Sequence, residues 1–309
     1  MNCMLTILGI ALVLAAVFGG YIAEKGNPYV LLQPAELWIV GGAAAGIVLI
    51  ANPPATIAKM LRGVRIILFP REAGRVAYLR ALRMLYEILS YLQRAGQLAL
   101  ERHIEDPASS SIFSQYPELL RDNSTMNFLC DSLRLLVIGA TTAGEIDRLM
   151  ETDIEVQRRG HHQPVSALNA IADALPGLGI VAAVLGVVIT MQSIGAAPQT
   201  VGEKVAAALV GTFLGILLCY GVVGPLAARL ESLAEAHAQY LQVLRTAIVA
   251  FVRGASPLMS LEFARRSIPP ESRPGFEEME IVIRREARVP PATPPPGATE
   301  ENAKAAASA

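Results

Sequence analysis

The sequence LPGLGIVAAVLGVVIT at residues 175–190 lies within a longer segment, 174–202, that contains no charged side chain. A helix needs about 20 apolar residues to cross the hydrocarbon core of a bilayer, and this segment exceeds that length. Because backbone amides in hydrocarbon must be bonded within their own segment, an isolated apolar run of this kind is expected to be helical. The segment therefore predicts a transmembrane helix.

Three further segments have the same pattern. Charged residues are also absent from 1–23, 37–56 and 205–228, each of which can cross a bilayer as a helix. The first could be taken for a secretory signal, but it has no Lys or Arg before Lys25 and is longer than the apolar core of a typical signal peptide. The sequence thus predicts an all-α membrane protein with four transmembrane helices.

The distribution of basic residues predicts the orientation of these helices. Basic side chains follow the second run, precede the third and follow the fourth: Lys59, Arg62, Arg65, Arg71, Arg158, Arg159 and Arg229. The only basic residues in the two short loops are Lys25 and Lys204. By the positive-inside rule, the short loops face outward, whereas the long middle segment and both termini face the cytoplasm.

Composition and motifs exclude several classes of function. The chain carries 26 Lys and Arg against 27 Asp and Glu, so its charge does not indicate nucleic acid binding. Its 3 cysteines are widely spaced, which argues against disulfides and a zinc site. The adjacent His161 and His162 lack the spacing of metal ligands on a helix and are expected in a solvated loop. No nucleophile elbow, phosphate-binding loop or dinucleotide motif is present, so we expect no enzymatic activity, cofactor or metal.

The middle segment predicts a helical cytoplasmic lobe between the second and third membrane helices. Residues 73–105 are expected to form one long helix, with an apolar stripe at Leu82, Leu85, Leu89 and Leu92. The opposite face carries a charged ladder at seven-residue spacing: Arg80, Glu87, Arg94 and Glu101. This ladder is interpreted either as a solvated amphipathic face or as an electrostatic docking strip. Helices are also expected near 125–150 and, after the fourth membrane helix, near 230–252.

The membrane segments contain small residues four apart, which let helices approach closely in lipid. These pairs are Gly42 with Gly46, Ala182 with Gly186, and Gly211 with Gly215. They indicate close packing either within the chain or between subunits.

Other features of these segments concern bending and polarity. Pro176 and Pro225 each remove a backbone donor, so each predicts a bend that is either structural or a hinge. Thr212 places a hydroxyl group within the predicted fourth membrane helix. Pro176, Ala183 and Thr190 are seven residues apart and are expected to share one face of the third helix.

The same segments contain no acid. Glu36, Asp173 and Glu203 are expected at helix ends, so no membrane-buried carboxylate is predicted. Intramembrane carboxylates are the usual carriers of protons and cations. Either the chain conducts nothing or another chain supplies the carboxylate.

Four phrases of the sequence resemble the MotA family of flagellar motor stator subunits, within the MotA/TolQ/ExbB group. They are QPAEL at 33–37, LERHIEDP at 100–107, LPGLGIVAAVLGVV at 175–188 and VGTFLGILLCYG at 210–221, and the resemblance extends to about Phe276. It implies a bacterial inner-membrane subunit, five copies of which surround two MotB-like chains whose Asp carries the ion. It also implies that the cytoplasmic lobe pushes on the rotor protein FliG.

The resemblance assigns roles to individual residues. Glu101 matches the rotor-facing acid of the family, Pro176 and Pro225 match its two functional prolines, and Thr212 matches the hydroxyl near the ion site. Relatives often carry Arg eight residues before the acid, but here Gln93 occupies that place and Arg94 follows it. Sodium-type relatives carry a hydroxyl where this chain has Ala183, so the resemblance implies protons.

Together these features predict five parts of the chain. The parts are 1–56 with the first two membrane helices and a short periplasmic loop, 57–168 as a cytoplasmic helical domain, 169–228 with the two helices lining the ion path, 229–288 as a cytoplasmic helical segment, and 289–309 as a tail. The tail is poor in apolar residues and is expected to be disordered.

Two alternatives remain open at this stage. One is a proton channel of the ExbB or TolQ branch that energises the outer membrane, although those relatives usually have three helices and an outward N-terminus. The other is a membrane scaffold that moves no ions and only positions cytoplasmic partners.

Overall fold

The computed structural model describes residues 2–31, 33–68, 74–139, 142–192, 195 and 197–284. All regular secondary structure in these ranges is helical, as predicted. The chain divides into two compact units, Met1–Ala73 with Thr141–Arg245, and Gly74–Ala140 with Thr246–Ala309. The tail predicted at 289–309 lies outside the described residues.

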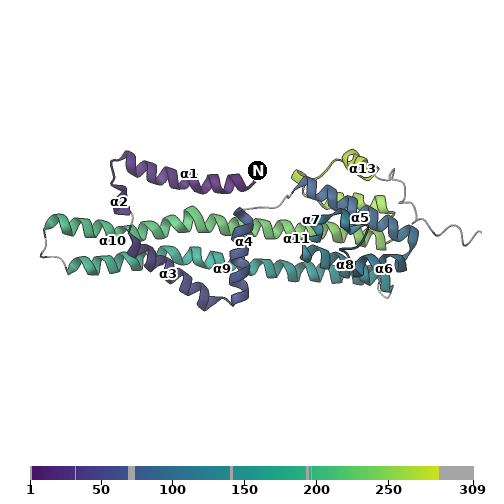
Figure 1. Ribbon diagram of the computed structural model, residues 1–309, viewed down its shortest axis with the longest axis horizontal. Coiled ribbons are helices and arrows are strands. Elements are labelled where there is room, and N and C mark those ends of the chain that lie inside the picture. Colours follow the sequence, from purple (N-terminus) through teal and green to yellow (C-terminus); the bar gives the residue numbers. More distant parts are fainter. Residues whose placement is uncertain are drawn as a thin grey trace, which may run out of the picture. The chain divides into compact units, whose positions relative to one another are not determined.

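The first unit contains the long apolar helices (Figure 1). Its elements are α1 (Asn2–Ala23), α2 (Pro28–Leu31), α3 (Pro34–Ala51), α4 (Pro54–Leu68), α9 (Ala143–Met191), α10 (Pro198–Leu218), a π-helical turn (Cys219–Val223) and α11 (Gly224–Val252), of which the part up to Arg245 belongs here. Four helical stretches are long and apolar enough to span a membrane: Leu5–Ala23, Pro28–Ala51, Ala143–Met191 and Pro198–Val252. The prediction of four transmembrane helices is confirmed.

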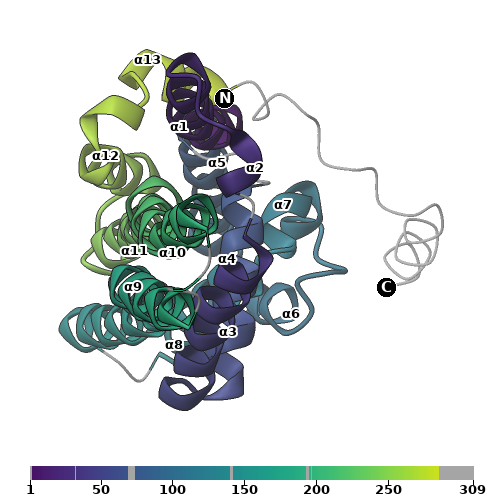
Figure 2. The same cartoon turned by 90° about the vertical axis from the view of Figure 1, so that its left-hand side faces the viewer.

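The antiparallel pair α9 and α10 forms the centre of this unit, and α3 packs against α9 (Figure 2). One buried cluster joins α3 to α9 and to the π-helical turn after α10; its members are Val40, Ala44, Ala172, Leu175, Ala182 and Cys219. A second cluster joins the end of α3 and α4 to α9 and α11 through Val48, Met60, Ile67, Val165, Ala167, Leu168, Ala227 and Leu230. None of the described side chains of α1 is buried, as expected of a helix whose surface is left for lipid or other chains.

Helix α9 is longer than the sequence suggested. It starts at a capping box, in which the Thr142 hydroxyl accepts from the Glu145 backbone N–H and the Glu145 carboxylate accepts from that of Thr142. The helix then continues to Met191. The expectation of a solvated loop at His161 and His162 is therefore wrong, because both residues lie inside α9. The His161 ring lies 5.1 Å from the ring of His237 on α11.

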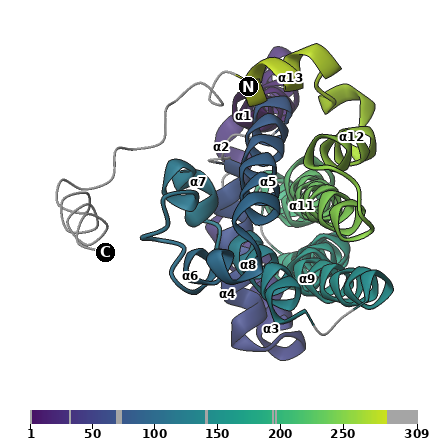
Figure 3. The same cartoon turned by 90° about the vertical axis from the view of Figure 1, so that its right-hand side faces the viewer.

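The second unit is a cluster of shorter helices (Figure 3). Its elements are α5 (Arg75–Ala95), α6 (Gln97–Glu105), η1 (Phe113–Gln115), α7 (Pro117–Leu120), α8 (Asn123–Ile138), the end of α11, α12 (Pro257–Ser267), η3 (Pro270–Ser272) and α13 (Phe276–Arg284). Helix α5 contacts α6, α12 and α13. Leu82, Leu85 and Leu89 are fully buried and Leu92 nearly so, which confirms the predicted apolar stripe.

Two glycines break helices that were predicted to be continuous. Gly96 has φ +82° and separates α5 from α6, and Gly139 has φ +67° and ends α8. Because residues with a side chain rarely adopt such left-handed angles, glycine at a helix C-terminus acts as a stop signal. The predictions of single helices at 73–105 and 125–150 are therefore wrong.

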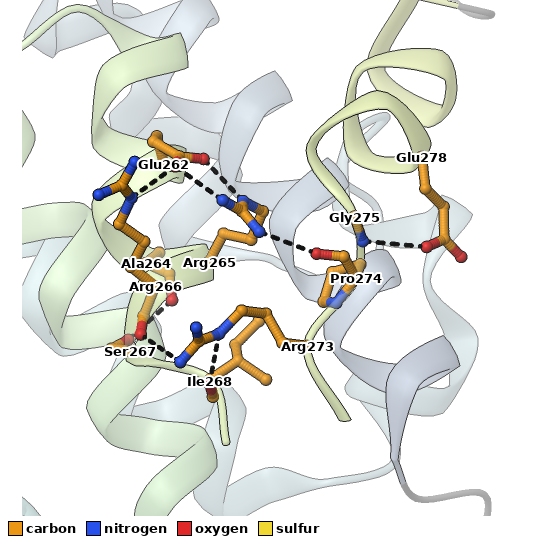
Figure 4. Close-up of polar contacts among 10 residues, drawn as sticks. All are labelled: Glu262, Ala264, Arg265, Arg266, Ser267, Ile268, Arg273, Pro274, Gly275 and Glu278. Carbon is orange, nitrogen blue, oxygen red and sulfur yellow. Dashed lines mark hydrogen bonds and ion pairs between the residues drawn. The ribbon is translucent and has the colours of Figure 1, made fainter. Parts of the chain in front are cut away.

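A polar cluster holds the C-terminal helices of the second unit together (Figure 4). Glu262 accepts hydrogen bonds from Arg265 Nε and Arg266 Nε, both at 2.7 Å. Arg265 Nη1 also donates to the Pro274 carbonyl at 3.0 Å, and Arg273 Nε donates to the Ile268 carbonyl at 2.9 Å. These bonds tie the connection between α12 and α13 to the end of α12.

The environment of Glu262 makes it the main acid-sensitive group of this cluster. Hydrogen bonding from Arg265 is the largest cause that lowers its pKa, from 4.5 to about 2, and it outweighs the opposing effect of burial. Its side chain is only 15% exposed, so solvent screens the interaction weakly.

Replacing Glu262 with Gln is expected to lower the unfolding free energy at pH 7 by about 3 kcal/mol at most, since each unit of pKa shift corresponds to about 1.4 kcal/mol. The pKa of Glu262 is depressed in the folded state, so its contribution is complete above 4.5 and disappears as the pH falls towards about 2. Thermal unfolding of the purified protein from pH 7 to pH 2.5 tests this. The matched control is Glu280→Gln, which breaks an exposed pair with Arg284. A Glu262→Gln deficit independent of pH would contradict the assignment.

Candidate functional site

The α9 and α10 backbones approach each other closely along a seam of small residues. A methyl group built on Gly179 would lie 2.7 Å from the Gly211 carbonyl oxygen, and one on Gly215 would lie 2.5 Å from the Leu175 carbonyl oxygen. One on Gly186 would lie 2.6 Å from the Ala208 side chain. Heavy atoms do not approach so closely, so this packing requires glycine.

The structure shows which of the small-residue pairs pack within the chain and which remain available for packing between subunits. The pairs Ala182 with Gly186 and Gly211 with Gly215 pack within the chain. In contrast, methyl groups built on Gly42 and Gly46 of α3 would meet no atom within 4 Å. The α3 pair is therefore not used for packing within the described part of this chain.

Thr212 and Ala183 both lie at this seam. The Thr212 hydroxyl donates to the Gly179 carbonyl across the two helices, at 3.4 Å. The Ala183 backbone nitrogen would lie 3.3 Å from a methyl group on Gly211, the residue before Thr212. The structure thus brings together two of the four residues predicted for the ion path, with the Ala183 side chain offering no polar atom.

The two predicted prolines lie in different local structures. Pro176 is inside α9, where it cannot donate to the Ala172 carbonyl, and the neighbouring Leu175 carbonyl faces Gly215 of α10. Pro225 is the second residue of α11, and the Gly224 N–H before it bonds to the Cys219 carbonyl of the π-helical turn. A π-helical turn and a proline are each recognised causes of helix bending, so the junction of α10 and α11 has two.

Glu36 lies at a helix end, as predicted, but its burial was not predicted from the sequence. It lies in the first turn of α3, is 8% exposed, and its Oε2 has no hydrogen-bond partner among the described residues. A methyl group on Gly211 would lie 2.5 Å from that oxygen, and one on Gly186 would lie 3.5 Å from Oε1. The expectation of no membrane-buried carboxylate is wrong, because α3 packs its first turn against α9 and α10. The only signal in the sequence was an acid one residue before an uncharged run.

The second candidate site is an exposed corner between α5 and α6. Arg94 is exposed near the end of α5, and its Nε donates to the Ser90 carbonyl at 3.1 Å. Glu101 is exposed on α6, beyond the turn at Gly96. Leu98, between them in the chain, is 80% exposed. We call Arg94, Leu98 and Glu101 the α5–α6 corner.

The predicted charged ladder does not exist as one line. Arg80 is paired with Glu118, and Glu87 accepts a hydrogen bond from the Tyr116 hydroxyl at 2.9 Å. Burial, and next the charge of Glu87, raise the pKa of Tyr116 and keep it a donor. The ladder was assumed to run along a single helix, but the break at Gly96 turns Glu101 onto another helix, and of the four only Arg94 and Glu101 remain exposed.

No metal site accompanies these groups in the described ranges. Within them, no three His, Cys, Asp or Glu side chains are grouped so as to hold a metal ion. Cys130 and Cys219 are buried free thiols.

Comparison with known proteins relates these features to one family. Residues 7–96 match the model of the motility protein A N-terminal region, and residues 121–243 match that of the MotA/TolQ/ExbB proton channel family. The chain is 36% identical to motility protein A of Escherichia coli K12, over 91% of this chain and 95% of that protein. It is also 36% identical to the chemotaxis protein LafT of Vibrio parahaemolyticus, over 88% and 96% of the two chains.

Solved structures show the same fold. The MotAB complex of C. jejuni contains a chain that aligns with a TM-score of 0.72 and 20% identity, over 88% of this chain and 97% of that one. The stator complex of Bacillus subtilis gives a TM-score of 0.69 and 23% identity, over 86% and 96%. The two family models together match most of the chain, and the relatives at 36% identity align over nearly its whole length. The chain therefore belongs to the MotA/TolQ/ExbB proton channel family, among its motility protein A members.

Proposed function

We propose that this protein is a flagellar stator subunit that conducts protons across the bacterial inner membrane together with a MotB-like partner and turns the flow into torque on the rotor protein FliG. The observation that carries the proposal is the identity of 36% to motility protein A of Escherichia coli over 91% of this chain. The protein is a channel subunit of a multi-pass inner-membrane type and not an enzyme.

A partner chain is proposed because the two central helices carry no charged residue along their apolar stretches, and the buried acid Glu36 lies only at the first turn of α3. The stretches 176–191 of α9 and 205–218 of α10 contain no charged residue. An ion carrier therefore comes from elsewhere, and the MotB-like chain is proposed to supply an Asp. The similar solved structures are of MotAB complexes, which supports this partner.

Copies of this chain are proposed to surround the partner, five around two. The open faces at Gly42 and Gly46 of α3, and the unburied side chains of α1, leave apolar surface for neighbouring copies. We further propose that both termini, and the segments 57–168 and 229–288, face the cytoplasm, since the basic residues gather there.

Proton entry is proposed to work through a change of charge. Protonating the partner's carboxylate removes a charge from a low-dielectric site and so changes which helix packing is preferred. A proton moving down the membrane potential releases about 2.3 kcal/mol per 100 mV. Pro176 and the junction at Pro225 are proposed as the hinges that convert this change into motion. The Ala183 side chain has no oxygen that could coordinate a sodium ion, which favours protons as the ion that is conducted.

The α5–α6 corner is proposed as the torque surface. Arg94 and Glu101 are exposed charges that other residues do not neutralise within the described part of the chain, and Leu98 adds apolar area between them. Charged, exposed contacts favour fast and repeated encounters over tight binding, which suits a moving rotor. The ExbB or TolQ alternative is disfavoured, because the full-length relatives are motility proteins and the chain has four membrane spans.

Deleting the gene is expected to leave cells with flagella that do not rotate. Soft-agar swimming, with flagella counted by microscopy, is the measurement, and re-expression of the chain is the control. Proton influx on co-expression with the partner separates a channel from a scaffold. Normal swimming of the deletion strain, with no influx on co-expression, would refute the proposal.

Replacing Pro176 with Ala is expected to preserve assembly but strongly reduce swimming, because Ala restores a backbone donor and stiffens α9 at the seam. The matched control is Pro164→Ala, which changes another proline inside α9 away from the seam. Swimming speed is compared at equal membrane abundance of the two variants. Equal speeds would show that Pro176 is only a structural bend.

Reversing the charge at Glu101 to Lys is expected to reduce torque while proton influx persists, because the residue is exposed and belongs to the second unit, whereas α9 and α10 belong to the first. The control is Glu277→Lys, an exposed acid of α13 in the same unit. Rotation of tethered cells gives the torque. If both variants rotate like the wild type, the α5–α6 corner is only a solvated surface.

A further inference from the structure

Among the described residues Glu36 is the only acid that is buried, and the proposed function does not explain its position. It is more than nine-tenths buried, and its Oε2 is both inaccessible to solvent and without a hydrogen-bond partner in the described chain. An unpaired carboxylate in such surroundings is costly, and inside membrane proteins such groups mark ion and proton pathways.

The surroundings of Glu36 are those of the proposed ion path. Its two carboxylate oxygens point to Gly211 of α10 and Gly186 of α9, where absent side chains leave room for them. Gly211 precedes Thr212, and the same glycine borders the backbone of Ala183. Glu36 therefore lies at the same seam as the residues proposed to line the path.

No other charge compensates Glu36 from the helices packed around it. The nearest charged residue on α9 is Asp173, about 20 Å along the helix from Gly186, and the nearest on α10 are Glu203 and Lys204, about 10 Å along the helix from Gly211. Helix α2, which also contacts α10, contributes only the exposed Tyr29 as a titratable group. The described residues form no ion pair with Glu36, so its charge state is governed by protons.

The position of Glu36 in α3 indicates on which side of the membrane it lies. It lies in the first turn, and the proposed topology places that end of α3 on the outer side of the membrane. The positive end of a helix dipole favours a negative charge in the first turn, which stabilises the anion between proton transfers. The group is thus at the side from which protons enter.

We propose that Glu36 is a proton relay at the outer end of the channel, a role that rests on the proposed stator function and adds a second carboxylate to its path. A hydronium ion from outside protonates the carboxylate, which becomes a neutral acid. The O–H bond then breaks as the same proton passes to the carboxylate of the partner chain, and Glu36 returns to the anion. One proton enters and one leaves, no electron is transferred, and the membrane potential drives the movement.

The test is rotation of the intact stator in cells that express this chain with its partner, for Glu36→Gln and Glu36→Asp. Gln keeps the size and polarity of the side chain but cannot carry a proton, whereas Asp can. Glu36→Gln is expected to slow rotation several-fold at low load, where proton delivery limits speed, with a steeper fall as external pH rises from 6 to 8. Torque near stall, where delivery is not limiting, is expected to stay close to that of the wild type.

The control variants separate a relay from a packing role. Glu36→Asp is expected to recover most of the low-load speed, and Glu203→Gln, which changes an exposed acid of α10, is expected to leave it unchanged. Membrane abundance of each variant is measured by immunoblot. If Glu36→Gln lowers membrane abundance, the low-load speed of Glu36→Asp is compared with that of the wild type instead. Asp can still carry a proton, so a relay predicts that the speed of Glu36→Asp depends on external pH.

The outcomes decide the proposal independently of the stator function. Wild-type speed and pH dependence in Glu36→Gln, or equal losses at low load and near stall, would overturn the relay. Rotation by the wild-type chain in the same cells shows that the stator function holds in either case.

Discussion

The close approach of α9 and α10 is the constraint on which the membrane unit depends. At Gly179 and Gly215, no methyl group fits between the two backbones. In lipid, helices are held together by close packing rather than by exclusion of water, so this contact supplies what a hydrophobic core supplies elsewhere. Helix α3 then packs against the pair through Val40 and Ala44.

The same contact creates the polar character of the seam. Where side chains are absent, backbone carbonyls become the available polar groups, and the Thr212 hydroxyl bonds to the Gly179 carbonyl in this way. Pro176 adds a carbonyl that lacks a helical donor, and Glu36 occupies space left at Gly211. Polar groups are costly in hydrocarbon, so a membrane protein keeps them at an internal surface of this kind.

The second unit is ordered by different forces. Its leucine stripe is buried in the usual way, but the exposed α5–α6 corner results from the turn at Gly96 and from the pairing of other charges. Arg80 is engaged by Glu118 and Glu87 by Tyr116, so only Arg94 and Glu101 of the original series point to solvent. The proposed torque surface is thus defined as much by the paired charges around it as by the two exposed ones.

The sequence by itself determined the four membrane helices, the all-helical fold, the leucine stripe of α5 and the family, because hydrophobic length and period are local properties. It also pointed to Ala183 and Thr212, but only the tertiary structure decided that they meet at one seam. The helix breaks at Gly96 and Gly139 depend on backbone angles that composition does not reveal. The burial of Glu36 depends on how α3 packs across two helices more than a hundred residues away in the chain, and no local pattern carries that information.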